Sequence, residues 1–310
     1  MNSAVVTIDC DYLSRQFAAA FLRVTPSGEA AFIENNTVHA VPILLKAMSE
    51  AGVRPEQIRY LIITHVHLDH AGGTAALLKH CPQATVLAHP RAAKHLIDPA
   101  KLVASAQAVY GVDRFKEVYG QIEPVSESRV RIMEDGSQAP LGNSALHFLH
   151  TRGHAKHHFV VHDPDADTVF TGDAFGLCYP SLQRAQQFIF PSTSPTDFEP
   201  EEALKSIDRI LSLGTSRAHL THFGPIQELR RAAEQLRPQI EFSRSVVEKY
   251  RGQALPFEEL ARRIEPELKL ELDRAMRASG LTPAAEDWSR LALDLEVNAQ
   301  GLAWVALKQP

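Results

Sequence analysis

Four side chains that can bind metal ions lie within six residues of one another. The segment that holds them is His65-Val66-His67-Leu68-Asp69-His70, and Ala71-Gly72-Gly73 follows it. Because side chains two residues apart on an extended chain project to the same side, His65 and His67 can reach one cation. Asp69 and His70 stand where the backbone has to turn, so they can face a second cation. Paired metal ions in proteins lie about 3.5–4 Å apart, and one curled loop can therefore serve both.

Three further candidate ligands follow at wide spacing, each just after a short apolar run with the composition of a strand. They are His154 in Thr151-Arg152-Gly153-His154, Asp173 in Thr171-Gly172-Asp173 and His222 in Thr221-His222-Phe223-Gly224. A single histidine after a strand is most often a hydrogen-bonded surface or core residue. The ordered set of four segments instead indicates strand ends that deliver their side chains to one edge of a sheet.

Apolar, β-branched runs predict the strands that must position these side chains. Such runs cover residues 4–9, 17–24, 29–34, 60–64, 84–89, 145–150, 169–172 and 218–220. The pattern also predicts helices at 38–51 and 200–213, whereas residues 91–120 are mixed helical and aromatic. After Pro225 the strand signals stop. Residues 226–310 read as three helices: Pro238 is expected to interrupt the first, the second spans about 256–279, and the third begins with Thr282 as N-cap and Pro283.

The four motifs, HxHxDH, GH, TGD and THFG, resemble those of the metallo-β-lactamase superfamily of metallohydrolases over roughly residues 5–225. This resemblance implies an α+β fold, an αββα sandwich of two mixed sheets with the metals at one edge. It implies a catalytic domain at 1–225 and a helical C-terminal extension at 226–310. It also implies a ligand set: a first metal held by His65, His67 and His154, a second held by Asp69, His70 and His222, and Asp173 bridging them.

Two positions depart from the family pattern. The early Asp-x-Gly turn that supports the metal site is Glu34-Asn35-Asn36 here, with Glu34 in place of the Asp and no Gly. Arg152 stands where Pro is common before Gly-His. Because residues behind a metal site orient its histidine rings, we expect Glu34 and His158 to play that part, with an ordinary strand histidine as the alternative for His158. Substrate contacts are expected from Tyr179, Phe188 and Phe190, for which the alternative is a place in the core.

The resemblance implies two divalent metal ions. Zinc suits five histidines and two carboxylates best, and iron and manganese accept the same set. We expect a metal-bridging hydroxide to cleave an ester-type bond (thioester, ester or lactone), with Asp69 orienting the nucleophile or accepting its proton. Acyl-homoserine lactonases carry a Tyr three residues after the bridging Asp, and Gly176 stands there instead. A phosphodiesterase of the same fold, a mononuclear-iron sulfur dioxygenase-like oxidoreductase and a regulatory protein with little turnover remain alternatives.

Composition excludes several other classes. With 310 residues, 45% of them hydrophobic and 22% charged, the chain has an ordinary globular composition. A net charge of −5 without a basic stripe predicts no nucleic-acid partner, and no apolar run nears the ~20 residues that span a membrane. Asp9 and Asp11 leave no signal-peptide core, so a cytoplasmic location is expected. With two divalent cations, two ionised carboxylates and a bridging hydroxide, the net charge of the metal site would be roughly +1, which suits a small anionic or carbonyl-bearing substrate. A homodimer is left open.

Overall fold

The computed structural model describes residues 3–193, 197–253 and 255–308. The chain divides into two compact units. Unit 1 comprises Met1–His150, His157–Gly172 and Thr215–Pro225, and unit 2 comprises Thr151–Lys156, Asp173–Gly214 and Ile226–Pro310. The predicted division between residues 225 and 226 stays a prediction.

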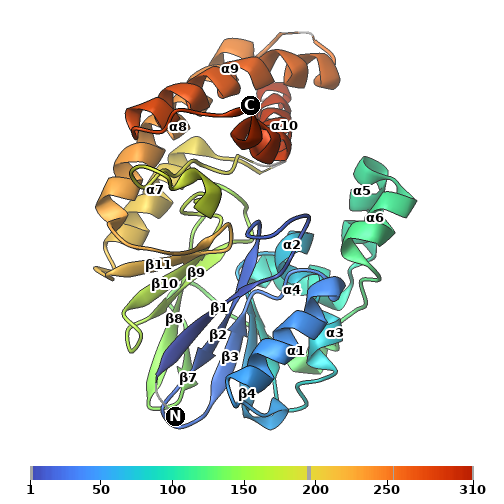
Figure 1. Cartoon of the computed structure of the whole chain (residues 1–310). Coiled ribbons are helices and arrows are strands. Elements are labelled where there is room, and N and C mark those ends of the chain that lie inside the picture. Colours follow the sequence, from blue (N-terminus) through green and yellow to red (C-terminus); the bar gives the residue numbers. More distant parts are fainter. Residues whose placement is uncertain (1–2, 194–196, 254, 309–310) are drawn as a thin grey trace. The chain divides into compact units, whose positions relative to one another are not determined.

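Within the described residues, two six-stranded sheets form the framework (Figure 1). The first runs β1 (Ala4–Asp9), β2 (Ala19–Val24), β3 (Ala30–Ile33), β4 (Ile58–Ile63), β5 (Thr85–Ala88), β6 (Val130–Ile132). The second runs β12 (Gly224–Ile226), β11 (Arg217–Leu220), β10 (Thr168–Gly172), β9 (Phe159–Asp163), β8 (Ser144–His150), β7 (Gln138–Leu141). Both sheets are mixed. In the first sheet, β1, β2 and β3 pair antiparallel, whereas β3, β4, β5 and β6 pair in parallel. In the second sheet, β7, β8, β9 and β10 pair antiparallel, whereas β10 and β11 pair in parallel.

The strand β4 shows why the sheets pack as they do. Successive side chains of a strand face opposite sides of the sheet. Ile62 accordingly joins the core between the two sheets, together with Phe21, Phe148 and Phe170. Leu61 and its neighbour Ile63 face the other way and pack with the helices outside the first sheet. A strand covered on both faces needs the continuous apolar run that β4 has.

The helices of unit 1 follow the predicted order. Helix α1 (Val41–Glu50) packs on the first sheet through Val41, Leu44 and Met48. The mixed segment 91–120 is helical, as α4 (Pro90–Ile97), α5 (Ala100–Tyr110) and α6 (Val112–Tyr119). The remaining short helices and turns of this unit are α2 (Leu68–Ala71), α3 (Thr74–Leu78), η1 (Val38–Ala40), η2 (Pro55–Gln57) and η3 (Glu127–Arg129).

Unit 2 contains the three predicted C-terminal helices, α8 (Leu229–Tyr250), α9 (Phe257–Ala278) and α10 (Ala285–Leu307), which pack on one another. The others are α7 (Pro200–Leu211), which contacts α8, and the turn η4 (Pro180–Leu182). Across residues 3–193, 197–253 and 255–308, none of the helices combines the length and apolar character that crossing a membrane requires.

Two details of the C-terminal prediction are wrong. Helix α8 continues through Pro238 instead of being interrupted, because the proline ring lies on the exposed side and the buried Leu236 and Ile240 hold the helix in place. Helix α10 begins at Ala285, not at Pro283. Its first turn is closed by Asp287, whose carboxylate accepts a hydrogen bond from the Ala284 N–H at 2.8 Å.

Candidate metal centre

The HxHxDH segment connects β4 to α2 in unit 1. His65 follows the buried end of β4, and His67 is the extended residue that precedes α2. The ring nitrogens His65 Nε2 and His67 Nδ1 lie 2.8 Å apart. Both side chains therefore present a nitrogen to the same small region, as the two-residue spacing predicts.

Asp69, His70 and His222 come together beside this pair, also within unit 1. Asp69 Oδ2 lies 3.4 Å from His222 Nε2 and 3.8 Å from His70 Nε2. One carboxylate oxygen and two imidazole nitrogens within 4.8 Å of one another can bind one metal ion. The structure thus gathers the three side chains assigned to a second metal, and their role as ligands stays a prediction.

His222 is held in the orientation that such a site needs. Its Nδ1 lies 2.8 Å from the carbonyl oxygen of Phe17, in the loop between β1 and β2. A carbonyl oxygen only accepts, so Nδ1 carries a proton, and Nε2, which faces Asp69, is the nitrogen left to bind a metal ion. The ring of Phe17 also stands edge-on to the imidazole, at 5.8 Å between centroids.

Glu34 lies next to His70, and its predicted part in supporting the metal site stays a prediction. Its buried carboxylate accepts a hydrogen bond from Thr64 Oγ1, and Oε1 lies 3.3 Å from His70 Nδ1. Thr64 Oγ1 in turn lies 3.1 Å from His65 Nδ1. Glu34, His65 and His70 also form a further group of side chains that could hold a metal ion.

The turn after β3 supports the ligand loop without the glycine of the family pattern. Glu34 and Asn36 take up left-handed backbone conformations, with φ of 62° and 56°. Asparagine tolerates this region better than most residues. Asn36 Nδ2 donates to the Asp69 carbonyl at 2.8 Å, and Asn35 Nδ2 donates to Thr74 Oγ1 at 2.9 Å. These two amides tie the turn to the ligand loop, and the sequence analysis missed them.

The protonation state of Asp69 follows from its neighbours. Loss of solvent around the carboxylate alone would raise its pKa, but the adjacent His70 and His222 outweigh this effect and hold the pKa of Asp69 below its ordinary value. Asp69 is therefore ionised at neutral pH, the state in which a carboxylate can bind a metal ion or accept a proton.

Two consecutive histidines lie next to His65 in unit 1. His158 is fully buried, with its ring centroid 4.9 Å from that of His65, and its part in orienting the metal ligands stays a prediction. His157 stacks on His65 at 6.1 Å and stands edge-on to His67 at 5.6 Å. The sequence analysis overlooked His157, although three histidines within residues 154–158 were a signal for it.

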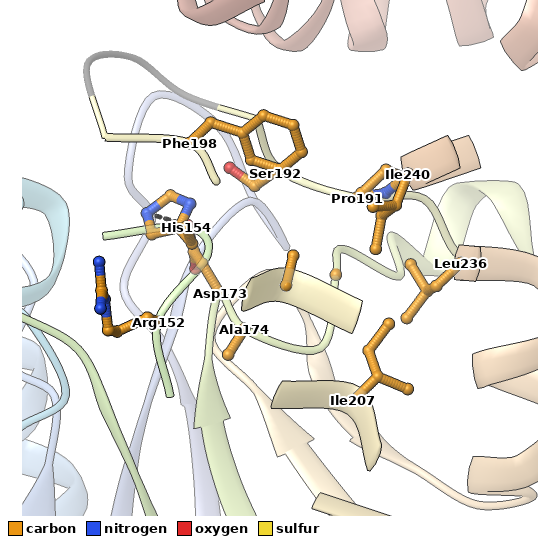
Figure 2. A pocket seen from close by; sticks show the side chains of 12 residues that line it. Arg152, His154, Asp173, Ala174, Pro191, Ser192, Phe198, Ile207, Leu236 and Ile240 are labelled. Atoms are coloured by element: carbon orange, nitrogen blue, oxygen red, sulfur yellow. Dashed lines mark ion pairs between the residues drawn. The ribbon is translucent and has the colours of Figure 1, made fainter. Parts of the chain in front are cut away.

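The two remaining predicted ligands belong to unit 2. His154 Nε2 lies 3.5 Å from Asp173 Oδ2, and both side chains are buried. Figure 2 shows them at one end of a small cavity whose other end is apolar. Gly153 lets this loop lie against α7, because a Cβ there would come within 2.4 Å of the Ala203 backbone.

The three predicted substrate contacts lie in the core of unit 2. The Tyr179 hydroxyl donates to Asp294 Oδ1 of α10 at 3.0 Å. The rings of Phe188 and Phe190 stack with centroids 6.0 Å apart, and all three side chains are at most 2% exposed. Contact between these residues and a substrate stays a prediction.

Comparisons with known sequences agree with this architecture. The sequence profile of the metallo-beta-lactamase superfamily matches residues 26–222. The chain is 29% identical over 216 residues to a metallo-beta-lactamase fold-containing protein of Sulfurisphaera tokodaii, covering 66% of this chain and 78% of that one. It is 30% identical over 134 residues to the acyl-coenzyme A thioesterase MBLAC2 of Gallus gallus, covering 42% and 45%.

Solved structures share the fold over nearly the whole chain. An archaeal metallo-beta-lactamase superfamily protein from Sulfolobus tokodaii aligns with a TM-score of 0.66 and 21% identity, over 97% of this chain and 99% of that one. A metallo-beta-lactamase family protein from Thermus thermophilus aligns with a TM-score of 0.62 and 19% identity, over 96% and 91%. The predicted fold class is confirmed, and the chain belongs to the metallo-beta-lactamase superfamily, whose members are typically metal-dependent hydrolases.

Proposed function

We propose that this protein is a dinuclear metal-dependent hydrolase that cleaves an ester-type bond. The observation that carries the proposal is the cluster in unit 1, where Asp69, His70 and His222 lie beside the His65–His67 pair. Five side chains with metal-binding atoms, gathered where the strands β4 and β11 end, have no comparable use in a plain structural core.

The donor set fits a pair of divalent cations. In this proposal the first is held by His65, His67 and His154, the second by Asp69, His70 and His222, and Asp173 is shared. The chain connectivity supports His154 and Asp173 of unit 2 as ligands. Asp173 directly follows β10 of unit 1. His154 lies in a segment of six residues, and the chain belongs to unit 1 both before it, up to His150, and after it, from His157. Neutral imidazoles and carboxylates suit zinc best, and iron or manganese accept the same ligands.

When bound, such a metal pair polarises a carbonyl oxygen and makes water acidic near neutral pH. The protein supplies the rest. Asp69 is ionised, so it can orient the attacking water or accept its proton. The Phe17 carbonyl and Glu34 keep His222 and His70 in place, which saves the entropy of ordering them at each turnover.

The choice of bond rests on two observations. One relative, 30% identical over 134 residues, is an acyl-coenzyme A thioesterase. At the position of the lactonase tyrosine, Gly176 has a φ of +80°, and a Cβ there would lie 2.6 Å from the Phe190 carbonyl oxygen. A tyrosine would not fit this backbone, so the tyrosine-assisted lactonase reaction is disfavoured. We therefore place thioesters first, then esters and other lactones, as small carbonyl-bearing or anionic substrates.

The test combines metal analysis with turnover on the full-length protein. We expect close to two zinc ions, or mixed zinc and iron, per chain, and hydrolysis of thioesters in a panel that also holds esters, lactones and phosphodiesters. Asp69→Asn and His222→Ala should each lose about 100-fold or more in kcat. His95→Ala, a histidine of α4 outside these clusters, is the matched control and should keep full activity.

Three results would contradict the proposal. A single iron per chain together with oxygen-dependent oxidation of persulfides would indicate the oxidoreductase. Turnover of phosphodiesters alone would indicate the phosphodiesterase. Two metals per chain without turnover of any substrate class would indicate a binding or regulatory protein.

A further inference from the structure

The cavity in unit 2 has two chemically different ends. Its polar end is formed by Arg152, His154 and Asp173, and its apolar end by Ile207 of α7 together with Leu236 and Ile240 of α8 (Figure 2). Leu236 and Ile240 are four residues apart and so lie on the same face of α8. Two predicted metal ligands and two side chains of the C-terminal helices therefore share one space, although more than sixty residues separate Asp173 from Leu236.

The apolar end is unsuited to water. Ile207, Leu236 and Ile240 are at most 3% exposed and offer no hydrogen-bond partner. A water molecule there would lack the two to four polar contacts that hold buried water in proteins. A hydrocarbon group would instead bury its surface, which favours each methylene that fits by about 4-fold in affinity.

The space is also short. Gly176 borders it, and a Cβ there would lie 2.7 Å from Leu236 Cδ2. Gly153 and Ala203 are packed equally closely on the side of His154. Little more than a water-sized volume is left free between the lining side chains, so only a small group can enter without movement of α8. In the proposed hydrolase His154 and Asp173 are metal ligands, so a group in the apolar end beside them would be bonded close to the reacting carbon.

From this geometry we infer that the cavity is the acyl subsite of the enzyme, that it takes the short apolar chain attached to the reacting carbonyl carbon, and that Leu236 and Ile240 set the chain length accepted. The inference rests on the proposed hydrolase function and names its substrate class as short-chain acyl thioesters or esters. It also gives α8 of the C-terminal region a direct part in substrate choice.

The test is a chain-length profile on the full-length, metal-loaded protein. Acyl thioesters from acetyl to decanoyl with one common thiol are compared by kcat/KM. We expect the wild type to prefer short chains and to fall by 10-fold or more beyond its optimum. Leu236→Ala and Ile240→Ala should move the optimum to chains about two carbons longer, and Leu236→Phe should lower kcat/KM even for acetyl. Binding of the matching carboxylic acids, measured by calorimetry, should shift in the same order.

Val246→Ala is the matched control. Val246 is a buried residue of α8 that does not line the cavity, so its truncation destabilises the helix without changing the profile. The inference is overturned if Leu236→Ala lowers kcat/KM by the same factor at every chain length, as the control would. It is equally overturned if the variants change the preference for the thiol, in a second series with a fixed acyl group. Inactivity of the wild type on every thioester and ester would instead remove the proposed function itself.

Discussion

Three of the predicted metal-binding histidines of unit 1, His65, His70 and His222, are buried. In each, the ring nitrogen that faces away from the cluster lies next to a polar group that orients the ring. His222 uses Nδ1 on the Phe17 carbonyl, His70 presents Nδ1 to Glu34, and His65 presents Nδ1 to Thr64. A ring that is already oriented loses less entropy when it binds a metal, and a neighbouring carboxylate makes it more basic. The residues behind the site should therefore matter for metal affinity almost as much as the ligands.

Glu34→Gln tests this expectation directly. The substitution keeps the size of the side chain and removes the charge beside His70, so the affinity for the more weakly bound metal ion should fall about 10–100-fold. A competition titration against a chromophoric chelator measures it. Glu50→Gln, at the exposed end of α1, is the control. Equal affinities in the two variants would mean that Glu34 does not support the site.

Gly172 is the second residue on which local geometry depends. It has a φ of +49°, and a Cβ would lie 2.5 Å from Thr64 Oγ1 and 2.6 Å from His158 Nε2. Gly52 also has a positive φ, of +70°, but has open space around it. Gly172→Ala should therefore lower the free energy of unfolding by about 1–3 kcal/mol more than Gly52→Ala. Urea denaturation of both variants gives the difference, and equal losses would show that only backbone strain matters.

At the scale of elements, a buried ion pair joins the two sheets of unit 1. Arg23 of β2 is 1% exposed and pairs with Asp163 at the end of β9 and with Asp165 in the turn that follows. Removing one partner of a buried pair leaves an uncompensated charge, whereas an exposed pair contributes little.

Arg23→Ala should accordingly cost about 3–5 kcal/mol of unfolding free energy. The control Arg59→Ala breaks a half-exposed contact with Glu29 and should cost about 0–1 kcal/mol. Denaturant titrations measure both. The double variant Arg23→Ala with Asp163→Asn should recover part of the loss, because it removes the stranded charge. A loss for Arg23→Ala no larger than that of the control would mean that the pair does not stabilise the sandwich.

At the scale of the whole molecule, the three cysteines report on unfolding. Cys10 and Cys81 lie in unit 1 and Cys178 in unit 2, and all are buried free thiols. Burial raises the pKa of Cys81 to about 11 and of Cys178 to about 12, and it also raises the pKa of Cys10. The folded protein therefore keeps these thiols protonated at pH 8, and the thiolate is the reactive form.

We expect all three thiols to react with a disulfide reagent at least 100-fold more slowly in the native protein than in denaturant at pH 8. The pKa of each thiol is higher in the folded protein than in the unfolded chain. The protonated thiols therefore contribute fully to the free energy of unfolding at neutral pH, and this contribution is lost as the pH rises beyond about 9. Counting the modified cysteines over time by mass spectrometry measures this difference in reaction rate. A thiol that reacts rapidly in the native state would show that its surroundings open without global unfolding.

Much of the fold could be predicted because its signals are local. The apolar run of β4 requires burial on both faces, and the spacing of His65 and His67 on an extended chain requires them to point the same way. The structure forms that strand and places one nitrogen of the His65 ring 2.8 Å from one nitrogen of the His67 ring. Residue type and spacing alone decide such features, and they also carry the resemblance that placed the chain in its superfamily.

Other features were decided by tertiary structure. Any residue supplies a backbone carbonyl, so nothing in the sequence marked Phe17 as the partner of His222. Pro238 should break a helix by its own preference, yet packing of the neighbouring apolar side chains holds α8 intact. The cavity beside His154 and Asp173 is lined from loops, α7 and α8. Its shape depends on how closely distant segments pack, and that distance is a property of the folded chain and not of any stretch of sequence.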